Sequence, residues 1–312
     1  MTGHTWPVID NSSPITYQAS RMRLRSVELE MPRADAAVEF LESTWGLVGA
    51  GRSKKASYLR GTGDHPYVMA IGEAASPAVT SVTFSGTKQE LQRIRSRAIK
   101  AGIRVEACTA ELNEPGAPAG FRLTGPEGQC FRFVSDRKPA TRLRDPNKPI
   151  ALTHVPINAS DADVCTKFAL EVLGFKLSDR TRLMDFIRCD STHHALAFVR
   201  TGVSALHHMA FEMQDLDAVM RNVGRLRDQG IDPAWGPGRH GPGNNVFAYY
   251  VAPFGAVLEY TSEVERVDNS YKVGGPDDWK WPPGRTDHWG LSKRDDARLH
   301  AAEQNFRFRP FS

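Results

Sequence analysis

The chain has 312 residues and carries 40 Lys and Arg against 36 Asp and Glu, a formal net charge of +4. The charges are scattered rather than blocked, and no apolar run approaches the roughly 18 residues of a membrane-spanning helix, so neither a nucleic acid nor a membrane is expected as a partner. The four cysteines, Cys108, Cys130, Cys165 and Cys189, have no CxxC spacing and the N-terminus has no leader pattern, which favours a cytoplasmic protein with reduced thiols.

Two long segments predict the same order of elements: a strand, a turn, a helix and a closing glycine. One contains RSVELEMPRADAAVEFLESTWG, and the other begins LTHVPINASDADV and continues to EVLG. Their closing glycines, Gly46 and Gly174, lie 128 residues apart. Glycine just past the last helical turn is a common helix stop. The two segments therefore look like copies of one unit.

The same spacing returns further along the chain. RIRSRAIKAG and NVGRLRDQG each predict a helix that ends at a glycine, and Gly102 and Gly230 are again 128 residues apart. A turn followed by a closing strand is expected at GPEGQCFRFVS and at APFGAVLEYTS, with Gly128 and Gly255 offset by 127 residues. We interpret this register as an internal repeat.

In the second half, short runs rich in apolar, β-branched and aromatic residues predict strands. These runs are HHALAFVR, HHMAFEM, NNVFAYYVAP and AVLEYTSE. Amphipathic helices are expected over about 161–172 and 215–229. Ser160, followed by Asp161 and Asp163, is the expected N-terminal cap of the first of these helices.

The alternation of these elements predicts an α+β fold of two tandem domains. Each domain would contain paired βαβββ modules that form a curved mixed sheet around a central cavity. The polar, proline-containing run DRKPATRLRDPNK indicates an interdomain linker. The expected divisions are an N-terminal arm (1–20), an N-terminal domain without metal ligands (21–138), the linker (139–149), a C-terminal catalytic domain (150–265) and a tail (266–312).

Three side chains on separate predicted strands of the second half are candidate metal ligands: His154, His208 and Glu259. Two imidazoles and one carboxylate can hold Fe(II) or Mn(II) on one face and leave other coordination positions open. Because side chains alternate along a strand, only one member of a pair such as His207 and His208 can face the interior.

Each candidate ligand also has a simpler interpretation. A lone strand histidine is more often a structural residue, and a glutamate can face solvent from an edge strand. However, the matching positions of the first half are approximately Ser26, Thr80 or Ser81, and Arg132. Since the repeat does without His or Glu at these positions, the three residues of the second half are better explained by function.

The second half also resembles a known family in LTHVPIN, VLGFKLSD, THHALAF, LHHMAFEM and the run from GRHGPGNN to TSEVERVD. It is similar to the two-domain extradiol ring-cleavage dioxygenases of the vicinal oxygen chelate superfamily, which include 2,3-dihydroxybiphenyl and catechol 2,3-dioxygenases. The resemblance implies cleavage of a catechol-type ring with O₂, in aromatic hydrocarbon catabolism, by a homo-oligomer. It also implies Fe(II), less often Mn(II), at His154, His208 and Glu259.

By the same matching, His194 resembles the acid/base histidine of the family, while His240 and Tyr249 resemble groups that hydrogen-bond the catechol and oxygen. Register with Glu259 favours Tyr249 over Tyr250 as the inward tyrosine. Many biphenyl-type enzymes carry an acidic residue shortly after the histidine that His240 resembles. This chain has GPGNN there, so proton delivery or substrate selection would differ.

Two other classes of function fit parts of the pattern. Another metalloenzyme on the same scaffold, 4-hydroxyphenylpyruvate dioxygenase-like or glyoxalase-like, would use the same three ligands. A metal-free ligand-sequestering protein would need none of them. The tail contains Trp279, Trp281 and Trp289, which favour packing on an apolar surface, either at the mouth of the active site or at an oligomer contact.

Overall fold

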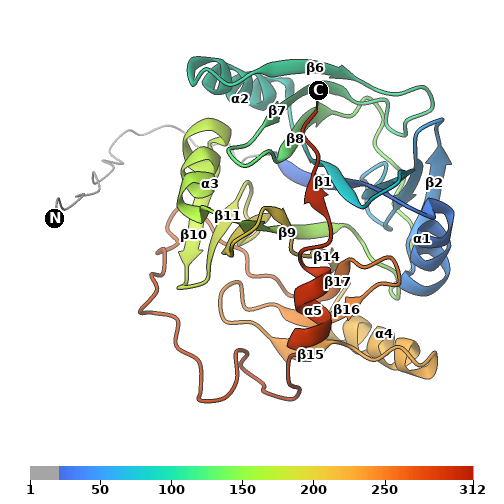
Figure 1. Ribbon diagram of the computed structural model, residues 1–312, viewed down its shortest axis with the longest axis vertical. Helices are drawn as coiled ribbons and strands as arrows, with labels where there is room; N and C mark the ends of the chain where they lie inside the picture. The colour runs from blue at the N-terminus through green and yellow to red at the C-terminus, as the bar shows by residue number, and fades with distance from the viewer. Residues whose placement is uncertain (1–20, 312) are drawn as a thin grey trace.

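The computed structural model describes residues 21–311, and the arm expected over residues 1–20 lies outside this range. Two mixed sheets, one from each half of the chain, form most of the structure (Figure 1). The first half contains β1 (Arg23–Met31), β2 (Val48–Arg52), β3 (Ser57–Arg60), β4 (Met69–Glu73), β5 (Ala78–Ser85), β6 (Val105–Thr109), β7 (Ala119–Thr124) and β8 (Cys130–Ser135). The second half contains β9 (Leu152–Ala159), β10 (Lys176–Arg180), β11 (Met184–Arg188), β12 (Leu196–Arg200), β13 (Ala205–Leu206), β14 (Met209–Glu212), β15 (Trp235–Arg239), β16 (Val246–Val251) and β17 (Val257–Ser262).

The two sheets have the same topology. Hydrogen bonding in the first half gives the order β2-β3-β4-β1-β5-β8-β7-β6, with parallel pairs at β1–β4 and β5–β8. The second half gives β10-β11-β12-β9-β14-β17-β16-β15, with parallel pairs at β9–β12 and β14–β17. The predicted α+β fold with a repeated mixed sheet is therefore confirmed.

Each half carries two main helical segments at matching places. The helices are α1 (Ala34–Phe40) with a π-helical turn η1 (Leu41–Trp45), α2 (Lys88–Lys100), α3 (Ala162–Phe168) with η2 (Ala169–Leu173), and α4 (Leu216–Asp228). Gly46 and Gly174 end the π-helical turns with φ of 95° and 71°. A side chain at this left-handed conformation is disfavoured, so the repeated glycines are helix stops as predicted.

The N-terminal cap of α3 differs by one residue from the prediction. Asp161, and not Ser160, is the cap, and its carboxylate accepts a hydrogen bond from the backbone N–H of Val164. The backbone N–H of Ser160 donates instead to Glu127 of the first half. Both residue types cap helices well, so sequence alone could not fix the starting residue.

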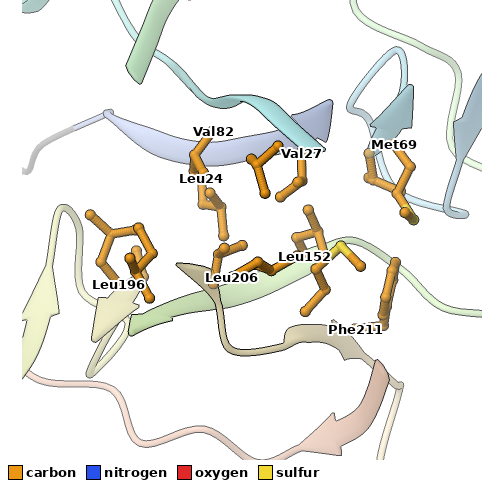
Figure 2. Close-up of a cluster of buried hydrophobic side chains, with 14 of the residues drawn as sticks. Leu24, Val27, Met69, Val82, Leu152, Leu196, Leu206 and Phe211 are labelled. Carbon is orange, nitrogen blue, oxygen red and sulfur yellow. The ribbon is translucent and has the colours of Figure 1, made fainter. Parts of the chain in front are cut away.

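The apolar cores of the two halves are continuous. Leu24, Val27, Met69 and Val82 of the first sheet face Leu152, Leu196, Leu206 and Phe211 of the second (Figure 2). All eight side chains are at most 5% exposed. Burial of such surface contributes roughly 25 cal/mol per Å², so the packing of one half against the other stabilises both.

Trp45 of η1 anchors the first half to the second. Its fully buried ring stacks on Tyr260 of β17 at 3.8 Å between centroids, and its edge meets Phe211 of β14. The Tyr260 hydroxyl donates a hydrogen bond to the backbone carbonyl of Trp45. These contacts fix α1 and η1 relative to the strand that carries Glu259.

We expect Trp45→Ala to lower the free energy of unfolding by about 3–5 kcal/mol, because it leaves a large cavity between the halves. Urea denaturation followed by circular dichroism measures the loss. Tyr260→Phe is the matched control, since it keeps the stacked ring and removes only the hydroxyl, with its hydrogen bonds to the Trp45 carbonyl and from Arg225, at an expected cost of about 1–3 kcal/mol. A loss below about 1 kcal/mol for Trp45→Ala would show that this contact does not hold the halves together.

The C-terminal segment joins the two sheets. After α5 (Asp296–Ala302), the short strand β18 (Arg307–Phe308) pairs in parallel with β5 and antiparallel with β13. Figure 1 shows this segment, in red, running from the second half to the first. All four cysteines are unpaired, as predicted. Across residues 21–311 no helix has the length and apolar character needed to cross a membrane.

Candidate metal centre

Strand register brings the three candidate ligands to one face of the second sheet. In the β9–β14 pairing, His154 lies opposite Ala210, and in the β14–β17 pairing Ala210 lies opposite Glu259. Directly paired residues share a face of a sheet, and residues two apart on a strand do too. His208, two positions before Ala210, therefore joins the same row. The small Ala210 side chain leaves room for the larger groups around it.

The structure brings the three side chains together as one buried group. Within residues 21–311, His154, His208 and Glu259 are the one set of three whose ligand atoms are placed to hold a metal ion, all within 4.8 Å of one another. Oε2 of Glu259 lies 3.1 Å from Nε2 of His154 and 3.1 Å from Nε2 of His208. The side chains of all three are at most 4% exposed.

The electrostatics of this group suit a cation. Burial by itself raises the pKa of Glu259, but the imidazoles of His154 and His208 outweigh it and hold that pKa well below its usual range. Burial also lowers the pKa of His208. Among the described residues, the ion-pair partners of Glu259 are these two imidazoles and no Lys or Arg. A buried carboxylate with two imidazoles is a donor set that fits a divalent transition metal.

Neighbouring groups orient one ligand for this role. Nδ1 of His154 lies 3.0 Å from the Thr153 hydroxyl, which in turn donates to the backbone carbonyl of Ala210. A hydroxyl that donates to a carbonyl must accept from Nδ1–H of the ring, so Nε2 is the atom of His154 that is available to bind a metal ion. Such outer contacts fix the ring orientation and tautomer of a ligand. The sequence analysis did not select Thr153, although it adjoins a predicted ligand.

Tyr249 and His240 lie beside the ligands. Tyr249 pairs with Glu259 in the β16–β17 register, so it faces the same side, whereas the Tyr250 ring meets Trp45 in the core. The Tyr249 hydroxyl is 3.0 Å from Nε2 of His240 and 3.4 Å from Nε2 of His208. Burial, reinforced by Glu259, raises the pKa of Tyr249, so the phenol keeps its proton. Burial lowers the pKa of His240 to about 4, which leaves it neutral.

His194 stands at the other side of the group and is held by a chain of hydrogen bonds. Its ring lies 4.2 Å from the ring of His154. Nδ1 of His194 is 3.0 Å from Nδ1 of His193, and Nε2 of His193 is 2.7 Å from Oδ2 of the buried Asp179. If His193 donates to the Asp179 carboxylate, its Nδ1 accepts from His194, whose Nε2 then carries a free lone pair. Burial and the neighbouring imidazoles lower the pKa of His194, so this base form persists.

Asp179 and His193 were not selected from the sequence. The pair His193-His194 was the one feature of the sequence that could have pointed to His193. Alternation of side chains along a strand, however, predicted that only one of the two would face the interior. Both members are in fact buried, because they precede β12 rather than lie within it. The partner of His193 is 14 residues earlier in the chain, on β10.

The GPGNN loop, residues 241–245, packs against His194 and Glu259. Gly243 has φ of 77°, and a Cβ at this position would lie 3.0 Å from Cε1 of His194. Asn245, also missed from the sequence, is fully buried and donates to Thr261 at 2.8 Å and to Oε1 of Glu259 at 3.3 Å. The loop therefore contacts both His194 and a candidate ligand through its backbone and one amide.

Part of the C-terminal tail packs on this region. Tyr271 and the backbone N–H of Gly274 both donate hydrogen bonds to Asp179. A Cβ at Gly241 would lie 2.8 Å from the ring of Trp281, so the tail covers the GPGNN loop. Of the two places that the sequence left open for the tail, the structure places it beside the candidate site.

Comparison with known proteins gives consistent matches. The family model of the glyoxalase/bleomycin resistance protein/dioxygenase superfamily matches residues 151–260. A crystal structure of the Mn(II)-bound glyoxalase from Novosphingobium aromaticivorans is 32% identical, with a TM-score of 0.81, and the match covers 90% of this chain and 94% of that one. The chain belongs to the glyoxalase/bleomycin resistance protein/dioxygenase superfamily.

Curated relatives that resemble this chain are named as metapyrocatechases or as dioxygenases. Metapyrocatechase 2 of Cupriavidus necator is 30% identical over 187 residues, a match that covers 59% of this chain and 54% of that protein. The chain thus aligns with only about half the length of that relative. The iron-dependent extradiol dioxygenase of Rhodococcus jostii is 26% identical, with 80% of this chain and 92% of that protein covered.

The two halves of this superfamily member differ in the row that holds the candidate ligands. In the first sheet, Ser26 lies opposite Thr83 and Thr83 lies opposite Arg132, the same register as His154, Ala210 and Glu259. Ser81, two positions before Thr83, therefore matches His208. Of the two residues that the sequence left open for this position, Thr80 and Ser81, the register selects Ser81. The first half therefore has no metal ligands in this row.

Proposed function

We propose that the chain is an extradiol dioxygenase that cleaves the ring of a catechol-type substrate with O₂ at Fe(II). His154, His208 and Glu259 would hold the metal. The observation that carries the proposal is that His194, His240 and Tyr249 surround the same three side chains. Curated relatives with dioxygenase names support it. The reaction would belong to the second half, which we propose to span residues 150–265 after a linker at 139–149.

Each surrounding residue has a task that its environment allows. A bound divalent iron would supply a Lewis acid that acidifies the substrate hydroxyls and holds substrate beside O₂. Neutral His194 would accept a proton from a substrate hydroxyl at Nε2 and return it later to a leaving oxygen. The protonated Tyr249 hydroxyl would donate a hydrogen bond, and His240 would orient that phenol. The burial of His194 and Tyr249 and the partial burial of His240 would limit the access of bulk water to the reacting atoms.

A second candidate is a glyoxalase-like reaction with Mn(II), which the Novosphingobium structure favours. The two functions differ in their need for oxygen. The chain should be loaded anaerobically with Fe(II) or Mn(II), given a panel of mono- and bicyclic catechols, and then exposed to O₂. We expect a yellow ring-fission chromophore, with one O₂ consumed per product, only after oxygen enters. Turnover that continues unchanged without O₂ would favour the glyoxalase-like reaction.

The GPGNN loop offers a sharp test of the role of His194. Gly243→Ala adds a methyl group against the His194 ring, so we expect kcat/KM for the catechol to fall at least about tenfold, the usual cost of disturbing an outer contact of a metal site. Gly284→Ala is the matched control, because Gly284 has φ of 78° but nothing within 4 Å of its Cβ position. Both variants carry the same backbone strain, about 1–2 kcal/mol.

Steady-state kinetics and thermal unfolding of the two glycine variants separate strain from contact. We expect similar losses of stability and a loss of activity only in Gly243→Ala. Equal activity in both variants would mean that the loop does not position His194.

A further inference from the structure

The first half contains a cavity of its own on the side that matches the metal centre. It has a volume of about 290 Å³, at the small end of the range for small-molecule sites. Ser81 and Arg132, which occupy the positions equivalent to His208 and Glu259, line it. The first half thus has a cavity at the positions that match the metal centre, and the chemistry of its lining differs from that of the metal centre.

Nearly all charged groups of this cavity already have a partner of opposite charge. Arg132 pairs with Glu114 at 2.8 Å, and the Tyr67 hydroxyl donates to the same carboxylate at 2.7 Å. At the rim, Lys55 pairs with Glu111. The remaining charges that line it pair elsewhere, Arg122 with Glu106 and Glu30 with Arg309.

Glu28 is the exception. Glu28 is 9% exposed, and its carboxylate accepts hydrogen bonds from three hydroxyls, those of Ser26, Ser81 and Thr83. Among the described residues no Lys, Arg or His makes an ion pair with it. Arg25 donates to the Ser26 hydroxyl and is itself paired with Asp136 at 2.8 Å, so Arg25 and Arg132 act on Glu28 only through charge at longer range. The lining of the cavity therefore carries one net negative charge.

The geometry of Glu28 leaves room for one more donor. An ionised carboxylate has about four acceptor positions, and the three hydroxyls take three of them. A buried carboxylate is stabilised most by a charged donor at short range. Tyr58, Tyr67, Ala56 and Ala70 supply an apolar wall of the same cavity, with the two tyrosine rings 4.8 Å apart.

We propose that this cavity binds a small organic cation, a protonated primary amine that carries a short aromatic or apolar body. The ammonium group donates to Glu28, and the body packs against Tyr58 and the alanines. Aromatic rings also attract cations through their faces. Among the described residues, the one candidate metal-binding group is that of the second half, and it shares no residue with this cavity.

Three probes of one shape test the role of charge. Benzylamine is a cation, benzyl alcohol is neutral and benzoate is an anion, and isothermal titration of the full chain measures the binding of each. We expect benzylamine to bind at least about tenfold more tightly than the other two, the usual effect of a charged hydrogen bond. Equal binding of benzylamine and benzyl alcohol, or no benzylamine binding up to about 10 mM, would overturn the proposal.

Variants locate the site. Glu28→Gln keeps the side-chain shape and should weaken benzylamine binding at least about tenfold. Glu30→Gln is the matched control on the same strand, because Glu30 lines the same cavity but pairs with Arg309; we expect its binding to stay within about twofold of the unmodified chain. Binding that survives Glu28→Gln but disappears in His208→Ala would assign the amine to the metal centre and overturn the proposal.

A measurement on the unmodified chain decides the matter if Glu28→Gln does not fold. Cys108 lines the cavity and is partly exposed, whereas the other three cysteines are buried. Iodoacetamide should therefore label Cys108 first, and saturating benzylamine should slow this labelling several-fold while benzyl alcohol does not. Labelling at the same rate with and without benzylamine would contradict occupancy of the cavity.

Discussion

His208→Ala should reduce the metal content from about one ion per chain to almost none and lower kcat/KM for a catechol by at least about 10³-fold. The substitution removes one of three ligand atoms that lie within 4.8 Å of one another. It also takes from buried Glu259 one of the two imidazoles that hold its pKa down. A bound metal supplies several kcal/mol of charge stabilisation, and each 1.36 kcal/mol is about tenfold in rate.

Metal analysis after anaerobic loading and dialysis, together with steady-state kinetics, checks this expectation. His288→Ala is the matched control, because His288 is exposed and far from the candidate ligands in the sequence; its metal content and rate should not change. A His208→Ala chain that binds Fe(II) as the unmodified chain does would place the ion elsewhere.

His194→Ala should retain the metal and lose about 10²–10⁴ in kcat, the usual contribution of a positioned acid/base. His194 is not one of the three candidate ligands, although its ring lies 4.2 Å from that of His154. The buried Asp179 and His193 leave its Nε2 as an acceptor. Removing the ring should thus remove a proton acceptor without removing a ligand.

Metal content and kcat measured on the same His194→Ala sample separate the two roles. A variant that keeps full activity would show that another group moves the proton. A variant that loses its metal would show that His194 acts in metal binding instead.

Local patterns were enough to predict the repeated framework. Glycine pairs such as Gly46 and Gly174 mark helix ends in sequence because only glycine adopts their left-handed backbone at little cost. Alternating apolar runs marked the strands that carry His154 and Glu259, and the register of β16 with β17 placed Tyr249 as expected. These features depend on neighbours in the sequence or on one hairpin.

Features that depend on distant contacts could not be predicted. The two-residue strand β18 has no periodicity to mark it, and it forms because β13 and the first residues of β5, which lie before the pairing of β5 with β8, leave backbone groups for it to pair with. Asp179 and Asn245 are polar residues in unremarkable runs, and their roles follow from contacts with His193 and Glu259 that only the folded sheet creates. The shared core between the halves is likewise a property of the assembled sheets.

The partners of a buried carboxylate distinguish the metal centre of the second half from the cavity of the first half. In the second half, a buried carboxylate has two imidazoles as partners, which suits a transition metal. In the first half, the buried carboxylate of Glu28 accepts hydrogen bonds from three hydroxyls. Neutral hydroxyls are weak metal ligands. We therefore propose that one fold offers sites for two different kinds of cation.

An anomalous diffraction map at the iron edge, from crystals loaded anaerobically with Fe(II), tests the central claim most directly. The account predicts one strong peak at about 2.0–2.2 Å from Nε2 of His154, Nε2 of His208 and a carboxylate oxygen of Glu259. No peak among these three atoms, or a stronger peak at other residues, would contradict it.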